Sequence, residues 1–489
     1  MKSVRDNPIR RLTPSDVVAD EVTQLDLDRW QALYPGCVDI YPLAPLQAGL
    51  YFTALGSAGN DVYNVQTLIG VRGELDLPLL SAAFDTVLNR YPNLRVSISV
   101  SHAGQPYAVV ADHMRIPVRE IDFADLPDAQ QRLHEFFRAD QAEHFDLAQG
   151  PLLRITVVHL PGNRHTVLLT SHHLLTDGWS GQLLPREIFA EYAGRGGAPL
   201  GDPETFARFL RLTRDREEAT EAAWQSYLED VRPCLVAPAR TPDRGGVPEG
   251  RTFVLDDETV ARATGLAAEQ GATFSLVCQL AWANALRYVT GEQATVFGEV
   301  VSGRPADLDG VDHAVGCFAN TIPVAIDLAG DRTWRDHLAE MQRHRVDLME
   351  YHQYRLTSAM RTAGRSGPAA RKLFDSMFVF QSYPPGRDEL EISVREGGLE
   401  LVSFEGGGAT DNALLLMIFP ANSLLPGDAV QAVVFYAEDC FEADDARIIE
   451  TAFRNTLRAI AEQPDRAVAD TTVIDDEDQG LLVMRRMWQ

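Results

Sequence analysis

Cysteine is scarce in this chain, and no residue spacing typical of a metal site occurs. The five cysteines are odd in number and widely separated: Cys37, Cys234, Cys278, Cys317 and Cys440. We therefore expect no disulfide framework and a reducing, cytoplasmic location. The 489 residues contain neither a Cys-x-x-Cys nor a His-Glu-x-x-His spacing, so the sequence gives no support for zinc-dependent hydrolysis.

Long apolar runs and positive charge are also in short supply. No run of about 18 apolar residues predicts a membrane span, and residues 1–6 lack the apolar core of a signal peptide. Asp and Glu number 70 against 44 Lys and Arg, which gives a formal net charge of −26. This acidity argues against nucleic acid or a membrane as the partner. A content of 45% hydrophobic and 23% charged residues is typical of a globular protein, here long enough for two or three domains.

The most informative stretch is residues 171–180, Ser-His-His-Leu-Leu-Thr-Asp-Gly-Trp-Ser. It follows an apolar run that predicts a buried strand, residues 165–170, and precedes an amphipathic pattern that predicts a helix, residues 181–192. His172 and His173 therefore lie where a strand ends, which is where folds usually place chemistry. If strand alternation persists that far, the two side chains point to opposite sides, and only one faces a given cleft.

The residue types in this stretch favour proton transfer or the positioning of an amine. Imidazole has an unperturbed pKa of about 6.5, so a histidine can accept a proton from an attacking amine near neutral pH or hold that amine in place. Asp177 is close enough to brace the turn, and Gly178 permits backbone torsions that a side chain would forbid. Either histidine alone could simply cap a turn. The full pattern His-His-x-x-x-Asp-Gly should arise by chance in roughly one chain of this length in a thousand.

The segment from His172 to Gly178 resembles the active-site signature of the condensation domains of nonribosomal peptide synthetases, in the superfamily that includes chloramphenicol acetyltransferase. Tyr91 stands where histidine is common in that family. Further stretches that resemble family motifs are residues 41–52, 89–95, 145–154, 302–305, 315–324 and 374–384. The resemblance covers essentially residues 38–470.

The resemblance implies a mixed α/β fold with two chloramphenicol acetyltransferase-like lobes in a V-shaped pseudo-dimer around a central tunnel. A lobe boundary is expected near the loops of residues 196–250, which are rich in Pro, Gly and charge. The expected domain limits are a linker from an upstream carrier protein (1–36), an N-terminal lobe with the histidine motif (37–215), a C-terminal lobe (216–472) and a C-terminal linker (473–489).

Hydrophobic periodicity predicts the main elements on both sides of that boundary. The predicted strands are residues 96–100, 152–160, 165–170, 251–255, 294–301, 414–419 and 431–436. The predicted helices are residues 26–33, 79–87, 181–192, 206–231, 257–269, 275–289 and 445–461.

The resemblance also implies roles for single residues. His173 is expected mid-tunnel as the essential group and His172 as mainly structural, while Gly178 allows close approach of a pantetheine thioester. Asp177 and Arg304 are expected to form a buried structural pair. The implied catalytic set is His173, His172, Asp177 and Gly178, and the implied tunnel and floor residues are Trp179, Ser180 and Asn320.

The function implied is that of an acyltransferase that forms an amide bond. The amine of an acceptor aminoacyl thioester attacks a donor thioester, and both are carried on 4'-phosphopantetheine arms of an upstream and a downstream peptidyl carrier protein. The domain needs no cofactor of its own, is expected to be monomeric and neighbours an adenylation domain in an antibiotic or siderophore assembly line. Residues 41–52 resemble the subgroup that takes a D-configured donor.

Three alternatives stay open at this point. An epimerization domain shares the histidine motif but differs in its counterparts of residues 41–52 and 316–324. An ester-forming or other acyltransferase of the superfamily is not separated by these motifs. A non-catalytic recruiting relative would lose His173 or Gly178, and this chain keeps both. The amino acids that are joined, and whether His173 acts as a base or positions the amine, do not follow from the sequence.

Overall fold

The chain is described from a computed structural model, which covers residues 11–19, 21–56, 63–194, 201–237, 248–358, 372–382, 387–407, 412–421, 429–475 and 477–481. The fold is mixed α/β, as the sequence analysis predicted, and its described residues divide into two compact units. Unit 1 consists of Met1–Asp215, Arg304–Phe318 and Tyr383–Gly408. Unit 2 consists of Arg216–Gly303, Ala319–Ser382 and Ala409–Gln489.

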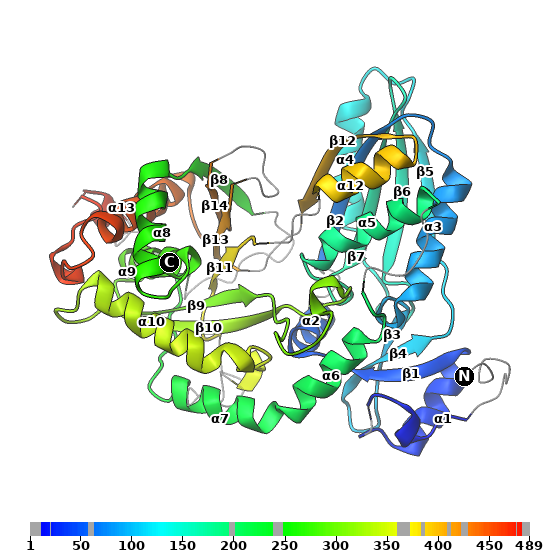
Figure 1. Cartoon of the computed structure of the whole chain (residues 1–489), viewed down its shortest axis with the longest axis horizontal. Coiled ribbons are helices and arrows are strands. Elements are labelled where there is room, and N and C mark those ends of the chain that lie inside the picture. Colours follow the sequence, from blue (N-terminus) through cyan, green and yellow to red (C-terminus); the bar gives the residue numbers. More distant parts are fainter. Residues whose placement is uncertain are drawn as a thin grey trace. The chain divides into compact units, whose positions relative to one another are not determined.

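Unit 1 contains a five-stranded sheet in the order β12-β2-β7-β6-β5 and a three-stranded sheet in the order β1-β4-β3 (Figure 1). The strands of the first are β12 (Glu400–Gly407), β2 (Asn64–Arg72), β7 (Arg164–His172), β6 (Leu153–Leu160) and β5 (Val118–Asp122). Those of the second are β1 (Cys37–Pro42), β4 (Pro106–Ala111) and β3 (Val96–Val100). β7 lies between β2 and β6 and is antiparallel to both, so its apolar side chains are buried along almost the whole strand.

The helices of unit 1 contact these sheets or one another. α3 and α12 each contact α5, and α4 contacts β2 and β6. The bounds are α1 (Gln24–Leu33), α2 (Pro45–Gly56), α3 (Leu77–Arg90), α4 (Ala129–Gln141), α5 (Ser180–Tyr192), α6 (Thr205–Asp215) and α12 (Arg387–Glu396). Short 3-10 turns are η1 (Pro14–Asp16), η2 (Pro92–Leu94) and η3 (Val311–His313).

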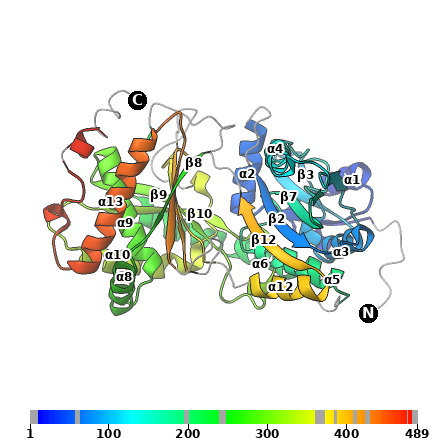
Figure 2. The same cartoon turned by 90° about the horizontal axis from the view of Figure 1, so that it is seen from above.

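Unit 2 is built on a six-stranded sheet in the order β10-β9-β11-β13-β14-β8. Its strands are β8 (Glu249–Val254), β9 (Ala294–Val301), β10 (Asn320–Asp327), β11 (Ser376–Phe380), β13 (Leu414–Phe419) and β14 (Gln431–Tyr436). Its helices and turns are α7 (Glu217–Leu228), α8 (Asp257–Glu269), α9 (Phe274–Thr290), α10 (Trp334–Leu348), η4 (Met349–Tyr351), α13 (Ala443–Glu462) and η5 (Val468–Asp470). α8, α9 and α13 pack on one another beside the sheet (Figure 2). Their apolar side chains belong to the large core of this unit.

The predicted strands and helices all have counterparts, with one difference. The helical stretch predicted for residues 206–231 is two helices, α6 and α7, which are separated at Arg216. The physical reason is that the two halves have different partners. Phe206 and Phe209 of α6 pack on Phe318 in unit 1, whereas Trp224 of α7 belongs to a cluster in unit 2.

Parts of both predicted linkers are packed into the units. Leu12 and Trp30 are 5% and 0% exposed and join a cluster with Ile40 of β1. Val473 and Ile474 belong to the main core of unit 2. The remaining linker residues 1–10, 20, 476 and 482–489 lie outside the described residues, as do residues 383 and 384 of the motif-like stretch 374–384.

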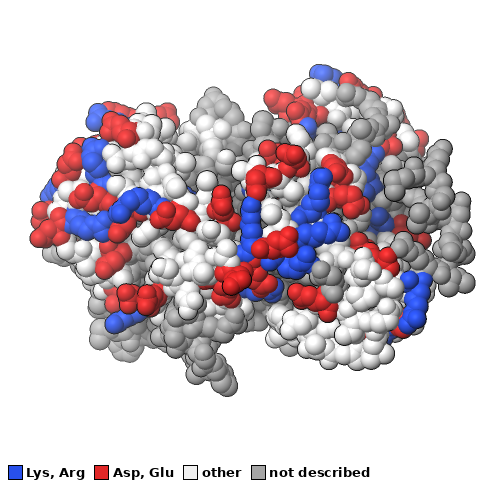
Figure 3. All heavy atoms as spheres, turned by 60° about the horizontal axis from the view of Figure 1, so that its bottom comes forward, with Lys and Arg blue, Asp and Glu red and all other residues white. Residues whose placement is uncertain are grey.

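Two surface properties bear on the partners considered above. None of the helices in the described part of the chain is long and apolar enough to cross a membrane. On the face that Figure 3 shows, acidic groups border the clusters of basic ones.

Candidate functional site

The end of β7 fixes the backbone of both histidines. His172 is the last residue of the strand, and its N–H donates to Leu152 O at 2.9 Å. The next residue, His173, donates its N–H to Tyr63 O at 2.8 Å. The two histidines are therefore anchored to the two segments that flank β7 in the sheet.

His172 is buried and is part of the turn itself. Its side chain is 0% exposed, and its Nδ1 accepts the Leu174 N–H at 3.1 Å. An Nδ1 that accepts a hydrogen bond carries no proton, so this nitrogen is committed to the turn backbone. The His172 carbonyl accepts the Leu175 N–H at 2.9 Å, which closes the turn.

His173 differs from its neighbour. It is only half-buried, and its Nδ1 has no hydrogen-bond partner among the described residues. Burial lowers the pKa of His173, and the nearby Asp177 carboxylate offsets this only in part. The ring is therefore neutral at pH 7, with a nitrogen that none of the described protein groups occupies.

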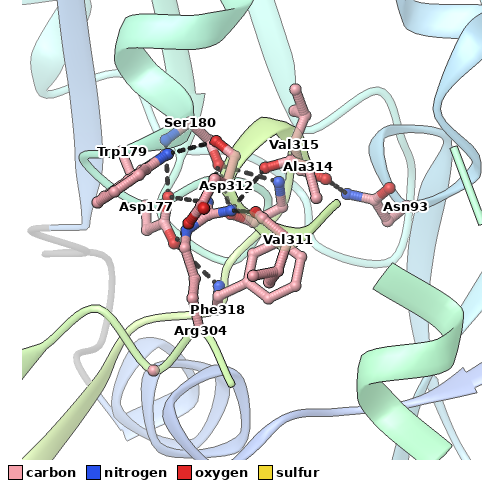
Figure 4. A network of polar contacts seen from close by, with 12 residues as sticks. Asn93, Asp177, Trp179, Ser180, Arg304, Val311, Asp312, Ala314, Val315 and Phe318 are labelled. Atoms are coloured by element: carbon pink, nitrogen blue, oxygen red, sulfur yellow. Dashed lines mark hydrogen bonds and ion pairs between the residues drawn. The ribbon is translucent and has the colours of Figure 1, made fainter. Parts of the chain in front are cut away.

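Asp177 holds the second half of the turn, and both of its oxygens are engaged. Oδ1 accepts the Ser180 N–H at 2.8 Å, which places a negative charge at the start of α5 where the helix dipole favours it. Oδ2 accepts the Phe318 N–H at 3.0 Å. Arg304 Nη2 lies 3.3 Å and 3.4 Å from the two oxygens, so the structure brings this sequence-distant pair together (Figure 4).

The surroundings of Arg304 explain how the buried pair is tolerated. Both side chains are 2% exposed, so desolvation costs several kcal/mol unless other hydrogen bonds replace water. Arg304 Nη1 supplies these by donating to the carbonyls of Val311 and Ala314. The guanidinium also lies over two aromatic rings, 4.2 Å from the centre of Phe318 and 5.2 Å from that of Trp179.

The other predicted site residues have clear positions. Ser180 is 0% exposed, so its hydroxyl contacts protein groups and not solvent, and Trp179 Nε1 donates to Asp312 O at 2.8 Å. Gly178 is half-buried. Asn320 begins β10 in unit 2, where its Nδ2 donates to His352 O and Tyr354 O, both at 2.8 Å.

The sequence did not predict which residues contact the segment Arg304–Phe318. Asn93 Nδ2 donates to Val315 O at 3.0 Å, and both residues are buried. Gly316 approaches α6 so closely that a Cβ there would lie 2.4 Å from Phe206 Cδ2. The only signal for Asn93 was its place in the motif-like stretch 89–95, because a contact across more than 200 positions leaves no local pattern.

The neighbouring Cys317 is not equipped as a nucleophile. It is fully buried, and this burial, together with the Asp177 charge, raises its pKa well above the ordinary value for a thiol. A thiol that stays protonated is a poor nucleophile. Within the described ranges, no three His, Cys, Asp or Glu side chains are grouped so that they could hold a metal ion. The chemistry available here is that of one neutral imidazole in a braced turn.

Comparison with known proteins places this geometry in a family. One subunit of the linear gramicidin synthase of Brevibacillus parabrevis is 29% identical over 461 residues, 91% of this chain and 6% of the relative. Bacitracin synthase 3 of Bacillus licheniformis is 24% identical over 481 residues, 96% of this chain and 7% of the relative. The chain thus spans less than a tenth of the length of either protein.

A solved structure agrees on the fold. The first condensation domain of the calcium-dependent antibiotic synthetase, in complex with a substrate analogue, superposes with a TM-score of 0.68 and 18% identity. The match covers 89% of this chain and 99% of that one. The family profile of the condensation domain matches residues 38–483. The chain therefore belongs to the condensation domain family.

Proposed function

We propose that this domain is an acyltransferase that forms an amide bond in nonribosomal peptide synthesis. The donor is an acyl or peptidyl thioester, and the acceptor is an aminoacyl thioester. Both are attached to 4'-phosphopantetheine arms of peptidyl carrier proteins, one upstream and one downstream. An adjacent adenylation domain loads the acceptor carrier. The observation that carries the proposal is the half-buried His173, neutral and with an unoccupied Nδ1, at the end of β7.

The reaction asks little of the protein beyond positioning and one proton. The acceptor nitrogen forms a bond with the donor carbonyl carbon, and the carbon–sulfur bond then breaks. The nitrogen loses one proton and the departing thiolate gains one, so the exchange consumes no oxidant and no water. His173 is able either to accept the proton or to hold the amine, because its ring is neutral.

Asp177 takes no proton in this scheme. Its two oxygens already accept hydrogen bonds from Ser180, Phe318 and Arg304, so neither is left to receive a proton from the amine. We assign Asp177 and Arg304 the task of keeping the turn in shape. His172 has the same kind of role, because its Nδ1 is occupied by the turn backbone.

A reconstituted condensation assay tests the proposal. One carrier is loaded with a labelled donor and the other with an aminoacyl group, and the dipeptidyl thioester on the acceptor carrier is measured by mass spectrometry. The matched control is an acceptor whose amine is acetylated, which should give no product. Epimerization of the donor without amide formation would contradict the proposal, and so would transfer to a hydroxyl acceptor but not to an amine.

The same assay decides the configuration of the donor. We propose a preference for a D-configured donor, on the resemblance of residues 41–52 to the subgroup that follows epimerization domains. Matched D- and L-ended donors on one carrier are compared at equal loading. Faster use of the L donor would refute this preference without touching the proposed reaction.

A further inference from the structure

The segment Arg304–Phe318 comes from the second half of the sequence and yet belongs to unit 1. Besides Arg304 and Phe318, which contact Asp177, this segment contacts the histidine turn and the start of α5 through the backbone of Gly316. Gly316 O accepts the Asp177 N–H at 3.3 Å and the Ser180 hydroxyl at 2.7 Å. Two residues of the turn and helix start therefore depend on the position of a single carbonyl.

The Ser180 hydroxyl does more than donate to that carbonyl. Its Oγ also accepts the Gly316 N–H at 3.0 Å and Arg304 Nη2 at 3.1 Å. It thus satisfies both backbone groups of Gly316 and joins them to the charged pair. A hydroxyl with one donated and two accepted hydrogen bonds is saturated, so Ser180 has no capacity left for a substrate.

Gly316 is also confined from its other side. The closest atoms to a Cβ at this position would be Phe206 Cδ2 at 2.4 Å and, beyond the ring, Asn93 Nδ2 at 3.2 Å. The peptide is held between these residues and Ser180. A buried peptide that loses its N–H acceptor pays the full cost of desolvation, so it shifts instead.

We propose that Ser180 is a positioning residue. Its hydroxyl fixes the position of the Gly316 backbone by two hydrogen bonds, and the Gly316 carbonyl in turn fixes the conformation of the turn that carries His173. The inference rests on the proposed function, because the rate that it controls is that of condensation. Small displacements of a reacting group reduce a rate strongly even when substrate binding is unchanged. Loss of the hydroxyl should therefore lower kcat and leave KM almost unchanged.

The test compares two buried serines whose hydroxyls accept hydrogen bonds from different backbone N–H groups. Ser180→Ala removes the contact with Gly316, whereas Ser97→Ala removes a comparable one, the Gly150 N–H to Ser97 Oγ bond of 2.9 Å. Both serines are buried in unit 1. Hydrogen exchange of peptides that cover residues 311–318 is followed by mass spectrometry, beside kcat and KM in the two-carrier assay.

For Ser180→Ala we expect exchange in residues 311–318 to accelerate about tenfold, because a buried N–H loses its acceptor. We expect kcat to fall on the order of 10- to 100-fold with KM within about twofold. Ser97→Ala should leave both quantities near wild type. Gly316→Ala should reproduce the Ser180→Ala pattern, since its Cβ displaces the same peptide.

Unchanged exchange in residues 311–318 of Ser180→Ala overturns the inference, and so does a kcat equal to that of Ser97→Ala. If Ser180→Ala does not fold, Ser180→Cys replaces it, because a thiol keeps the volume and a weak donor. That variant should show intermediate exchange and kcat, and wild-type values for both would overturn the inference. Exchange does not depend on turnover, so an inactive wild type would count against the proposed function and not against the seating of Gly316.

Discussion

Each unit contains a strand that is followed by a short turn and a long helix. The two strand–turn–helix segments differ in the residues that their turns carry. In unit 1, β7 leads through residues 173–179 into α5. In unit 2, β14 leads through residues 437–442 into α13. The strand end and turn of unit 1 carry two histidines and a buried ion pair, and the turn of unit 2 contains no histidine.

The second turn has a local hydrogen bond and apolar anchors. Cys440 and Phe441 are buried in the main core of unit 2, and the Glu442 N–H donates to Asp445 Oδ2 at 2.8 Å in a capping box. Local hydrogen bonds and apolar packing are sufficient for such a turn. The turn of unit 1 instead depends on Arg304 and Gly316, which lie more than 120 positions away in the sequence. The turn of unit 1 leaves Nδ1 of His173 without a partner among the described residues, and it is held by residues from a distant part of the sequence.

The largest effect expected from this comparison is on activity. His173→Ala should reduce product formation by about 10²- to 10⁴-fold, the usual contribution of a positioned acid–base group, and leave the melting temperature almost unchanged. Cys440→Ala in the other turn should do the opposite, because it removes a buried sulfur from the main core of unit 2. Single-turnover condensation and thermal melting measure the two. Equal turnover by wild type and His173→Ala would remove His173 from the mechanism.

The next effect is on stability and concerns the external brace. Asp177→Ala and Arg304→Ala should each cost about 3–5 kcal/mol of unfolding free energy, because the partner is left as an uncompensated buried charge. The double variant should lose less than the sum, since the pair fails as a unit. Urea unfolding measures all three. Additive losses, or an inactive Asp177→Ala that melts like wild type, would return Asp177 to the catalytic groups.

A carboxylate in the first turn of α13, Asp445, should matter less than Asp177. Asp445→Ala removes the hydrogen bond that the Glu442 N–H donates in the capping box of α13, and a cap is worth about 1 kcal/mol. Activity should stay at the wild-type level. Unfolding in urea compares it directly with Asp177→Ala. A loss as large as that of Asp177→Ala would show that the two turns are braced in the same way.

The smallest expected effect is on the pH dependence. Burial lowers the pKa of His173, so its neutral form persists below the usual value of about 6.5, and the acid limb of kcat should lie below that pH. The unfolded chain binds this proton more readily than the folded one, so stability also falls as the pH drops below about 6.5. A kcat profile from pH 5 to 8 measures the limb, with Asp445→Ala as the control. An acid limb above pH 6.5 would contradict a buried neutral ring.

Much of this molecule could be predicted from local pattern, and the reason is physical. β7 and α5 are visible in the sequence through apolar alternation and helical periodicity, which depend only on neighbours in the chain. The Asp177–Arg304 contact was reached through the family motifs and not through periodicity. No local signal predicts that Ser180 bonds to Gly316 or that Asn93 bonds to Val315, because these contacts follow from packing between distant segments.

Two further features could not be predicted from the sequence for the same reason. The stretch of residues 206–231 has continuous helical character, and only the different partners of α6 and α7 explain its break at Arg216. β12 pairs with β2 from Glu400 opposite Arg72 onward, although more than 300 residues separate them. Its alternation could not reveal which sheet it would join.

The pairing of β12 with β2 has a consequence for synthesis of the chain. The sheet of unit 1 is complete only when Glu400–Gly407 has been made, long after its other four strands and most of unit 2. Until then, β2 presents an open edge, and for most of that time Asp177 lacks Arg304. An exposed edge strand is a template for wrong pairing. During synthesis there is therefore a long interval in which the first four strands of the unit 1 sheet exist but the edge of β2 is not yet paired. A chain terminated near residue 215 would keep this unpaired edge.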